Sequence, residues 1–174
     1  MTERVIIAGS GGQGIMLLGK VLAQAAMMED KFVTWLPAYG AEVRGGTAHC
    51  MVVVSDEEIG SPYVEKADTL IIMNQPSLAR FRNRLENKGI LIVNSSIVKV
   101  GTEALRFPFT EIAIELGNVK VANMVALGFY LAKERIVSKK NILKVMKMMT
   151  PAGRDDILKI NQKALETGVG LKNG

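Results

Sequence analysis

Residues 5–14, VIIAGSGGQG, decide the fold of this chain. Four apolar residues predict a short buried strand, and six residues rich in glycine follow them. Apolar residues then recur at helical spacing through about residue 29. A buried strand, a glycine loop and an amphipathic helix, in that order, are typical of the first unit of a nucleotide-binding α/β domain.

The glycine loop predicts a binding site for an anionic group. Gly9 and Gly11 allow backbone angles that side chains forbid, and Gly11 and Gly12 let a ligand approach the bare backbone. The first turn of the following helix presents unpaired N–H groups and a partial positive charge, which suit a phosphate. The alternative is that the glycines only form a tight turn. The candidate site residues of this loop are Gly9, Ser10, Gly11, Gly12, Gln13 and Gly14, with Ser10 and Gln13 able to add side-chain hydrogen bonds.

Length and composition indicate one soluble domain, spanning residues 1–174. The apolar fraction of 48% is high and only 22% of residues are charged, so we expect a partner to cover some apolar surface. We expect no membrane span and no signal peptide, and therefore a cytoplasmic protein. The single Cys50 excludes a disulfide within the chain and any cysteine-ligated cluster built from this chain alone. The net charge of +5 is scattered, which argues against nucleic acid as a partner.

The rest of the chain predicts a three-layer α/β/α Rossmann-like domain with a mixed, mostly parallel sheet and a helical C-terminal part. The sheet is expected to be mixed because the strands at 32–36 and 47–54 are joined without a crossover helix. Pro37 is expected to end the first of these two strands. Further strands are expected at 69–73, 90–93 and 105–109, and helices at 75–86, 110–116, 123–134, 139–149 and 155–166, with Thr110, Asn123 and Ser138 as caps and with a frayed end from residue 168.

A second glycine-containing loop, YGAEVRGG at residues 39–46, provides a fixed cation beside flexible backbone. Arg44, Gly45 and Gly46 suit a phosphate or a carboxylate of a partner, whereas the alternative is a surface ion pair between Arg44 and Glu42. An NAD site also requires an acidic residue at the end of the second strand. The residues there are Trp-Leu-Pro, so the sequence argues against NAD.

The sequence predicts no catalytic or metal-binding set in this chain. His49 and Cys50 are adjacent in a strand, so their side chains point to opposite faces and cannot form a dyad. His49 is interpreted as a packed strand residue. The methionines at 27, 28, 146, 148 and 149 are interpreted mainly as core residues, with a partner interface as the alternative. The lysines at 140, 144 and 147 are expected to form a solvated helix face.

The combination of motifs resembles the gamma subunit of 2-oxoacid:ferredoxin oxidoreductases, most closely the 2-oxoglutarate type. The resemblance rests on GSGGQG at 9–14, YGAEVRGG at 39–46, IGSP at 59–62 and VANMVALG at 121–128, and it extends over nearly the whole chain. It implies a subunit without catalytic residues of its own, in an enzyme that converts a 2-oxoacid, CoA and oxidised ferredoxin into an acyl-CoA, carbon dioxide and reduced ferredoxin.

The resemblance also implies cofactors and partners. Thiamine diphosphate is expected on the alpha and beta subunits and the iron–sulfur clusters on a ferredoxin-like subunit. The glycine loop is expected to face the phosphates of CoA, with Arg44, Gly45 and Gly46 nearby. Related single-chain enzymes have lysines where this chain has Val43 and Arg44. We expect Arg44→Ala to weaken the use of CoA more than that of the 2-oxoacid.

Three functions remain open at this level. The first is a CoA-positioning subunit of a 2-oxoacid:ferredoxin oxidoreductase, acting on 2-oxoglutarate or alternatively on pyruvate or a branched-chain 2-oxoacid. The second is a free-standing enzyme that binds NAD(P) or ATP at the glycine loop. The third is a purely structural assembly subunit, in which both glycine loops pack against partners.

Overall fold

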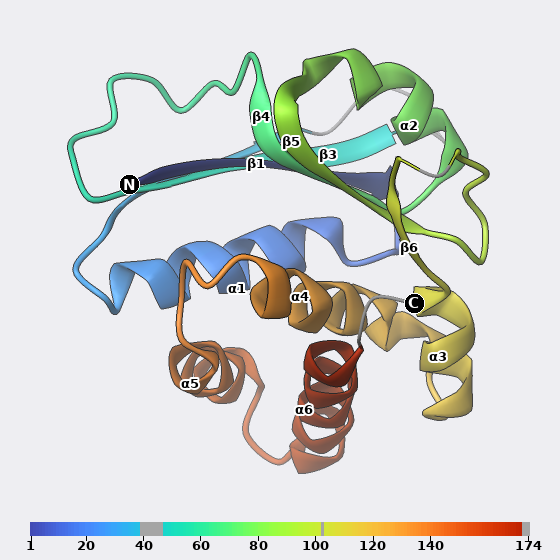
Figure 1. The fold of residues 1–174 in the computed structure, drawn as a ribbon. Coiled ribbons are helices and arrows are strands. Elements are labelled where there is room, and N and C mark those ends of the chain that lie inside the picture. Colours follow the sequence, from blue (N-terminus) through green and yellow to red (C-terminus); the bar gives the residue numbers. More distant parts are fainter. Residues whose placement is uncertain (39–46, 102, 172–174) are drawn as a thin grey trace.

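The computed structural model describes residues 1–38, 47–101 and 103–171. These residues form a twisted sheet with helices on both faces (Figure 1). In chain order the elements are β1 (Thr2–Ser10), α1 (Ile15–Met27), β2 (Phe32–Ala38), β3 (Thr47–Ser55), β4 (Ala67–Ile72), α2 (Gln75–Phe81), the short 3₁₀ helix η1 (Arg82–Arg84), β5 (Leu85–Asn94), β6 (Leu105–Phe107), α3 (Phe109–Glu115), the 3₁₀ helix η2 (Val119–Val121), α4 (Ala122–Lys133), α5 (Lys139–Met149) and α6 (Asp155–Gly170).

The strand order is β2-β3-β1-β4-β5-β6. β1, β4, β5 and β6 pair in parallel, whereas β3 runs antiparallel to both β1 and β2. The prediction of a mixed, mostly parallel sheet is therefore confirmed. Because β3 runs opposite to β1, its first residue Thr47 pairs with the last residue of β1, Ser10. The glycine loop and the start of β3 thus lie at the same edge of the sheet.

The helices cover the two faces unequally. α2 lies on one face, while α1 and α4 pack on the other and α5 and α6 form an outer tier beyond them (Figure 1). Side chains alternate between the two faces of the sheet along each strand, so the strands contribute to a hydrophobic core on each face. Ile7 and Cys50 face the α1 side, whereas Ile6 and Met51 face the α2 side. The prediction of a three-layer domain with a helical C-terminal part is confirmed.

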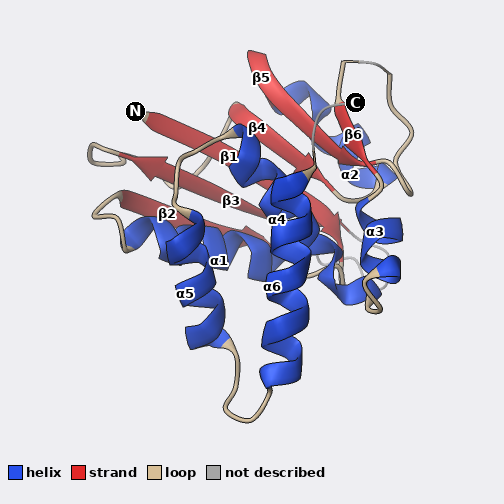
Figure 2. Ribbon diagram, turned by 60° about the horizontal axis from the view of Figure 1, so that its bottom comes forward, coloured by secondary structure: helices blue, strands red, loops and turns tan. Residues whose placement is uncertain are grey.

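α4 and α6 cross in direct backbone contact (Figure 2). A Cβ added to Gly128 of α4 would lie 2.1 Å from the carbonyl oxygen of Leu165, and one added to Gly168 of α6 would lie 2.0 Å from that of Val125. Both distances are far below a van der Waals contact. The crossing therefore requires glycine on both helices, and Gly168 is buried in it rather than frayed as the sequence predicted.

Several element bounds differ from the sequence predictions. β2 continues through Pro37 to Ala38 because it is an edge strand, where a missing N–H costs no ladder hydrogen bond. α2 ends at Phe81 rather than at residue 86, since Arg82–Arg84 tighten into a 3₁₀ turn and Leu85 already pairs in β5. Pro108 rather than Thr110 precedes the first residue of α3, whose N-cap makes no side-chain hydrogen bond. Ser138 caps α5 as predicted, by accepting from the N–H of Asn141.

A buried carboxylate joins β1 to β4 and α4 far from the glycine loop. Glu3 is 8% exposed, and its Oε1 accepts a hydrogen bond from Thr69 Oγ1 at 2.7 Å and one from the hydroxyl of Tyr130 at 3.5 Å. Burial is the main cause that raises the pKa of Glu3 to about 7, with a further contribution from the nearby charges of Asp68 and Glu134. Hydrogen bonds of the Glu3 side chain thus hold the amino end of β1 to β4 and α4.

Candidate functional site at the glycine loop

The glycine loop turns the chain from β1 into α1 within four residues, Gly11–Gly14. Two of its residues have left-handed backbone angles, Gly12 with φ +88° and Gly14 with φ +70°. Residues with a side chain rarely adopt such backbone angles, so these two positions favour glycine. The sequence predicted this conformational need at Gly9 and Gly11, which do not have a positive φ, so that prediction is wrong.

The four glycines serve different purposes. A Cβ on Gly9 would lie 2.6–2.9 Å from atoms of Gln13, Ile15 and Met73, and one on Gly14 would lie 2.3 Å from Asn123 Nδ2. These two glycines therefore allow close packing. Added Cβ atoms on Gly11 and Gly12 would meet nothing within 4 Å, and both residues are exposed. Of these four glycines, only Gly11 and Gly12 combine exposure with open space for a ligand.

Gln13 braces the loop from inside. Its Oε1 accepts a hydrogen bond from the N–H of Ser10 at 2.8 Å, and its Nε2 donates to the carbonyl of Met73 at 3.0 Å. Met73 follows β4, and its own N–H donates to the carbonyl of Ala8 at 2.8 Å. Both polar atoms of the Gln13 side chain are thus engaged in tying the loop to the ends of β1 and β4. The side-chain atoms of Gln13 that were predicted to bind a phosphate are therefore already paired within the chain.

A residue from the C-terminal half completes the loop. Asn123 is 2% exposed; its Nδ2 donates to the carbonyl of Gly14 at 3.1 Å, and its Oδ1 accepts from the N–H of Met124 at 2.9 Å. The carbonyl of Gly14 also accepts the N–H of Leu18, which belongs to the first turn of α1. Asn123 therefore holds the start of α1, whereas the sequence predicted it as the cap of its own helix, whose N-cap is Val121.

The open part of the loop borders a hollow of about 400 Å³. It is lined by Ser10, Gly11, Gly12, Gly14, Ile15, Met16, Leu17 and Ala48. Within the described helix α1, the first turn carries no acidic side chain, so its N–H groups keep their positive potential for a ligand. An exposed glycine backbone beside a helix N-terminus can receive an anionic group, and the apolar side chains of the first turn can receive a less polar continuation of it.

For the second predicted loop, residues 39–46, the structure describes only the flanking residues. Arg44, Gly45 and Gly46 lie outside the described residues. Of the residues that flank this loop, Ala38 pairs with His49 and Thr47 pairs with Ser10, so both flanks lie at the glycine-loop edge of the sheet.

An arginine that the sequence analysis did not select lies at this edge. Arg80 of α2 donates from Nη1 to Oγ1 of Thr47 at 2.6 Å. Its guanidinium carbon also lies 5.4 Å from the ring centroid of Phe81. A helix position with an exposed arginine gives no sequence signal of its own, because the contact joins residues that are 33 positions apart.

His49 and Cys50 lie on opposite faces of β3, as predicted. His49 is 7% exposed and packs on the ring of Phe81 at 4.7 Å, while burial, together with the charges of Arg80 and Arg84, lowers its pKa. Cys50 is fully buried on the α1 side, where burial raises the pKa of its thiol to about 12. The interpretation of His49 as a packed strand residue is confirmed.

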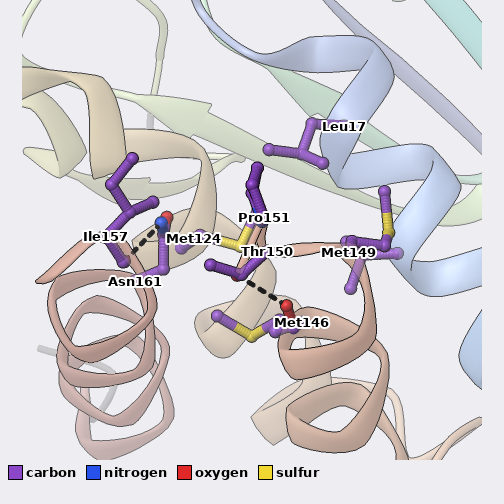
Figure 3. A pocket seen from close by; sticks show the side chains of 9 residues that line it. Leu17, Met124, Met146, Met149, Thr150, Pro151, Ile157 and Asn161 are labelled. Atoms are coloured by element: carbon purple, nitrogen blue, oxygen red, sulfur yellow. Dashed lines mark hydrogen bonds between the residues drawn. The ribbon is translucent and has the colours of Figure 1, made fainter. Parts of the chain in front are cut away.

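A second hollow, of about 190 Å³, lies among α1, α4, α5 and α6 (Figure 3). Its lining is apolar and rich in methionine, with Met124, Met146 and Met149 around Leu17, which also borders the first hollow. Its two polar residues hydrogen-bond to carbonyls of their own helices, Thr150 to Met146 and Asn161 to Ile157. The methionine prediction holds for Met146, which is 5% exposed.

Met27 and Met148 do not belong to the core. They are 63% and 68% exposed, so the prediction that the methionines fill core gaps is wrong for these two. The lysines at 140, 144 and 147 are exposed, as expected.

The part of the chain that the structure describes lacks a metal-binding cluster and a helix suited to cross a membrane. It contains no group of three or more histidine, cysteine, aspartate or glutamate side chains placed to hold a metal ion. None of its helices has the length and apolar character that crossing a membrane requires.

Comparison with known proteins adds a family match over almost the whole chain. A family model described as pyruvate ferredoxin/flavodoxin oxidoreductase matches residues 4–171. The ketoisovalerate oxidoreductase subunit VorA of Methanothermobacter thermautotrophicus is 40% identical over 168 residues, which are 95% of this chain and 35% of that protein. The 2-oxoglutarate synthase subunit KorC of Archaeoglobus fulgidus is 35% identical over 147 residues, which are 84% of this chain and 78% of that protein.

A solved structure has a similar fold and length. The gamma subunit of a keto/oxoacid ferredoxin oxidoreductase from Geobacter sulfurreducens superposes with a TM-score of 0.80 at 28% identity, covering 95% of both chains. By contrast, this chain spans about a third of the length of the VorA relatives that it matches.

Proposed function

We infer the function of this chain from the premise that it belongs to the pyruvate ferredoxin/flavodoxin oxidoreductase family. We propose that it is the gamma subunit of a cytoplasmic, multi-subunit 2-oxoacid:ferredoxin oxidoreductase. In this proposal it helps to bind CoA and to assemble the complex, without catalytic residues of its own. Thiamine diphosphate lies on alpha and beta partner subunits, the iron–sulfur clusters lie on a ferredoxin-like subunit, and ferredoxin accepts the electrons.

One observation carries the CoA part of the proposal. Gly11 and Gly12 leave open backbone at the start of α1, beside a hollow of about 400 Å³. CoA has phosphates for the backbone N–H groups and a long, less polar arm for the side chains of Met16 and Leu17. The brace formed by Gln13 and Asn123 fixes this backbone before a ligand arrives, which lowers the entropic cost of binding.

For the 2-oxoacid we propose 2-oxoglutarate, with a branched-chain 2-oxoacid as the second candidate. The KorC relative of Archaeoglobus fulgidus corresponds to this chain over 78% of its own length, as a separate gamma subunit should. The VorA relatives support the alternative, because they are 40% identical to this chain. Turnover of the anaerobically purified complex with 2-oxoglutarate, ketoisovalerate and pyruvate, each with CoA and a viologen dye, decides between them.

The first experiment tests CoA binding with Gly11→Asp in the assembled complex. A Cβ added at Gly11 would meet no atom within 4 Å and the residue is exposed, so we expect the variant to fold and assemble normally. Its carboxylate would repel a phosphate at the loop, and we expect the KM for CoA to rise about tenfold or more, with the KM for the 2-oxoacid unchanged. Gly60→Asp is the matched control, since Gly60 is also exposed and open but lies in the segment after β3, at the other end of the sheet.

The result that would discard the CoA role is an unchanged KM for CoA in Gly11→Asp. In that case the structural-subunit alternative gains support if the variant also loosens the complex. The free-standing alternative gains support if the isolated chain binds NAD(P)H or ATP. The assignment of partners has its own test, a pull-down of this chain from native cells. It fails if no thiamine- or iron–sulfur-containing subunits are recovered. Arg44→Ala stays a further prediction, with a selective loss of CoA use.

A further inference from the structure

We propose that Arg80 forms a second phosphate-binding point beside the glycine loop, so that the two together bind the two phosphate-bearing parts of CoA. This inference rests on the proposed function, because it takes CoA as the ligand. CoA carries a pyrophosphate and a separate 3′-phosphate on its adenosine. One would lie on the open backbone of Gly11 and Gly12, and the other on the guanidinium of Arg80.

The register of the sheet places Arg80 next to the loop. Ser10 and Thr47 are directly opposite each other in the antiparallel pair of β1 and β3. Opposite residues in such a pair have Cβ atoms roughly 5 Å apart. Arg80 Nη1 donates to Thr47 Oγ1 at 2.6 Å, so its guanidinium is one residue pair away from the start of the glycine loop. The two phosphate points would thus lie at the same end of the sheet, Arg80 on the α2 side and the open backbone at the start of α1.

Of the three arginines at residues 80–84, two have guanidinium groups that bond to acidic or carbonyl groups of described residues, whereas Arg80 keeps several N–H donors that no described residue accepts. Arg82 pairs with Glu103, and Arg84 donates to the carbonyls of Val64 and Glu65. Within residues 1–38, 47–101 and 103–171, no carboxylate forms an ion pair with Arg80. Its one side-chain hydrogen bond to a described residue uses one of five guanidinium N–H groups, and the remaining donors form a planar fork that suits a phosphate.

Two buried polar atoms on the same side of the sheet lack a hydrogen-bond partner near Arg80. Nδ1 of His49 and Oγ of Ser77 are buried and have no hydrogen-bond partner among the described residues. His49 lies two residues after Thr47 on β3, and Ser77 lies one helical turn before Arg80. Buried polar atoms are nearly always satisfied by protein, water or ligand, and leaving one unsatisfied costs about 1–3 kcal/mol. The surroundings of Arg80 therefore have unused hydrogen-bonding capacity.

The test compares Arg80→Gln with Arg82→Gln in the assembled complex. Both variants remove one arginine charge from the same segment, but only Arg80 contacts Thr47. We expect Arg80→Gln to raise the KM for CoA about tenfold or more, with kcat and the KM for the 2-oxoacid within about twofold of the wild type. Arg82→Gln should leave all three unchanged, and Arg80→Lys should recover part of the affinity because it restores the charge.

Substitution of 3′-dephospho-CoA for CoA identifies the phosphate. If Arg80 binds the 3′-phosphate, Arg80→Gln should raise the KM for CoA but not that for 3′-dephospho-CoA. If Arg80 binds the pyrophosphate, both values should rise by the same factor. Either pattern supports the proposal and assigns the remaining phosphate to the glycine loop.

Two outcomes would overturn the proposal. A KM for CoA within twofold of the wild type in Arg80→Gln, with a raised KM in Gly11→Asp, removes Arg80 from the site and leaves the proposed function intact. A lower kcat together with a raised KM for both CoA and the 2-oxoacid, without recovery in Arg80→Lys, means that Arg80 only supports the fold. If neither Arg80→Gln nor Gly11→Asp changes the KM for CoA, the proposed function itself fails.

Discussion

The glycine loop and the crossing of α4 with α6 both depend on pairs of glycines, for opposite reasons. Gly11 and Gly12 are exposed, and an added Cβ would meet nothing within 4 Å. An added Cβ at Gly128 or Gly168 would collide with backbone of the other helix at 2.1 or 2.0 Å. Gly11 and Gly12 leave open space in which a ligand can bind, whereas Gly128 and Gly168 let the backbones of two helices touch. Substitution of Gly11 should therefore affect ligand binding, whereas substitution of Gly128 or Gly168 should affect folding.

The largest effect is expected from Gly168→Ala. Because the methyl group would overlap the carbonyl oxygen of Val125, α6 must move away from α4, and we expect the free energy of unfolding to fall by about 3 kcal/mol or more. Gly170→Ala is the control, since Gly170 ends the same helix in open space. It should be neutral or stabilise by up to about 1 kcal/mol, because alanine favours helix. Urea unfolding of the full chain measures both, and equal effects would contradict the crossing.

A smaller effect is expected from Glu3, which contacts Tyr130 in α4, two residues beyond Gly128. The folded protein keeps Glu3 protonated up to about pH 7, whereas the unfolded chain loses this proton near pH 4.5. The folded state therefore binds more protons between these values, and the contribution of Glu3 to stability should decline as pH rises from about 4.5 to 7. Glu3→Gln should lose this decline and be about 2–3 kcal/mol more stable than the wild type at pH 8.

The Glu3 prediction is checked by the difference between the two unfolding curves. His49 has a lowered pKa in the folded state, so its own contribution rises with pH over part of the same range. The difference between wild type and Glu3→Gln removes this shared term. A difference that does not depend on pH would contradict the role assigned to Glu3. The glycine loop, residues 9–14, has no titratable side chain and should add nothing to it.

The smallest effect on stability is expected from Gly11→Ala. Gly11 has an ordinary negative φ and open space around it, so the change in the free energy of unfolding should stay within about 0.5 kcal/mol. Thermal unfolding of the full chain provides the measurement, with Gly14→Ala for contrast. Gly14→Ala combines a φ of +70° with a clash against Asn123, so it should destabilise clearly. A loss in Gly11→Ala as large as that in Gly14→Ala would mean that Gly11 is needed for folding.

Local signals were sufficient to predict the fold class. The apolar run before Gly9 gives β1, the periodic pattern after it gives α1, and Ser138 marks the start of α5. The short connection before Thr47 correctly predicts that β3 is antiparallel to β2. These features depend on residues that are close in sequence, so composition and spacing contain the information.

The missed features depend on contacts between distant residues. Pro37 remains within β2 because the strand is at the sheet edge, which no neighbour in sequence reveals. Asn123 is used to hold Gly14, 109 residues away, instead of capping α4. Among the described residues, Arg80 is linked to the candidate site by its hydrogen bond to Thr47, which lies 33 positions away in the sequence. The glycine loop could be predicted, but the residues that brace it and extend it required the structure.

Cys50 has a practical consequence for the chemical labelling of this chain. It is the single cysteine of the chain, it is 0% exposed, and its sulfur lies 3.6 Å from the carbonyl oxygen of Ile15. With a pKa of about 12, its thiol is almost entirely protonated at neutral pH and reacts slowly with electrophiles. A cysteine placed at exposed Gly60 would therefore be the one thiol of this subunit that takes up a maleimide spin label or dye quickly. Distances from residue 60 to other labelled points can thus be measured without first removing Cys50.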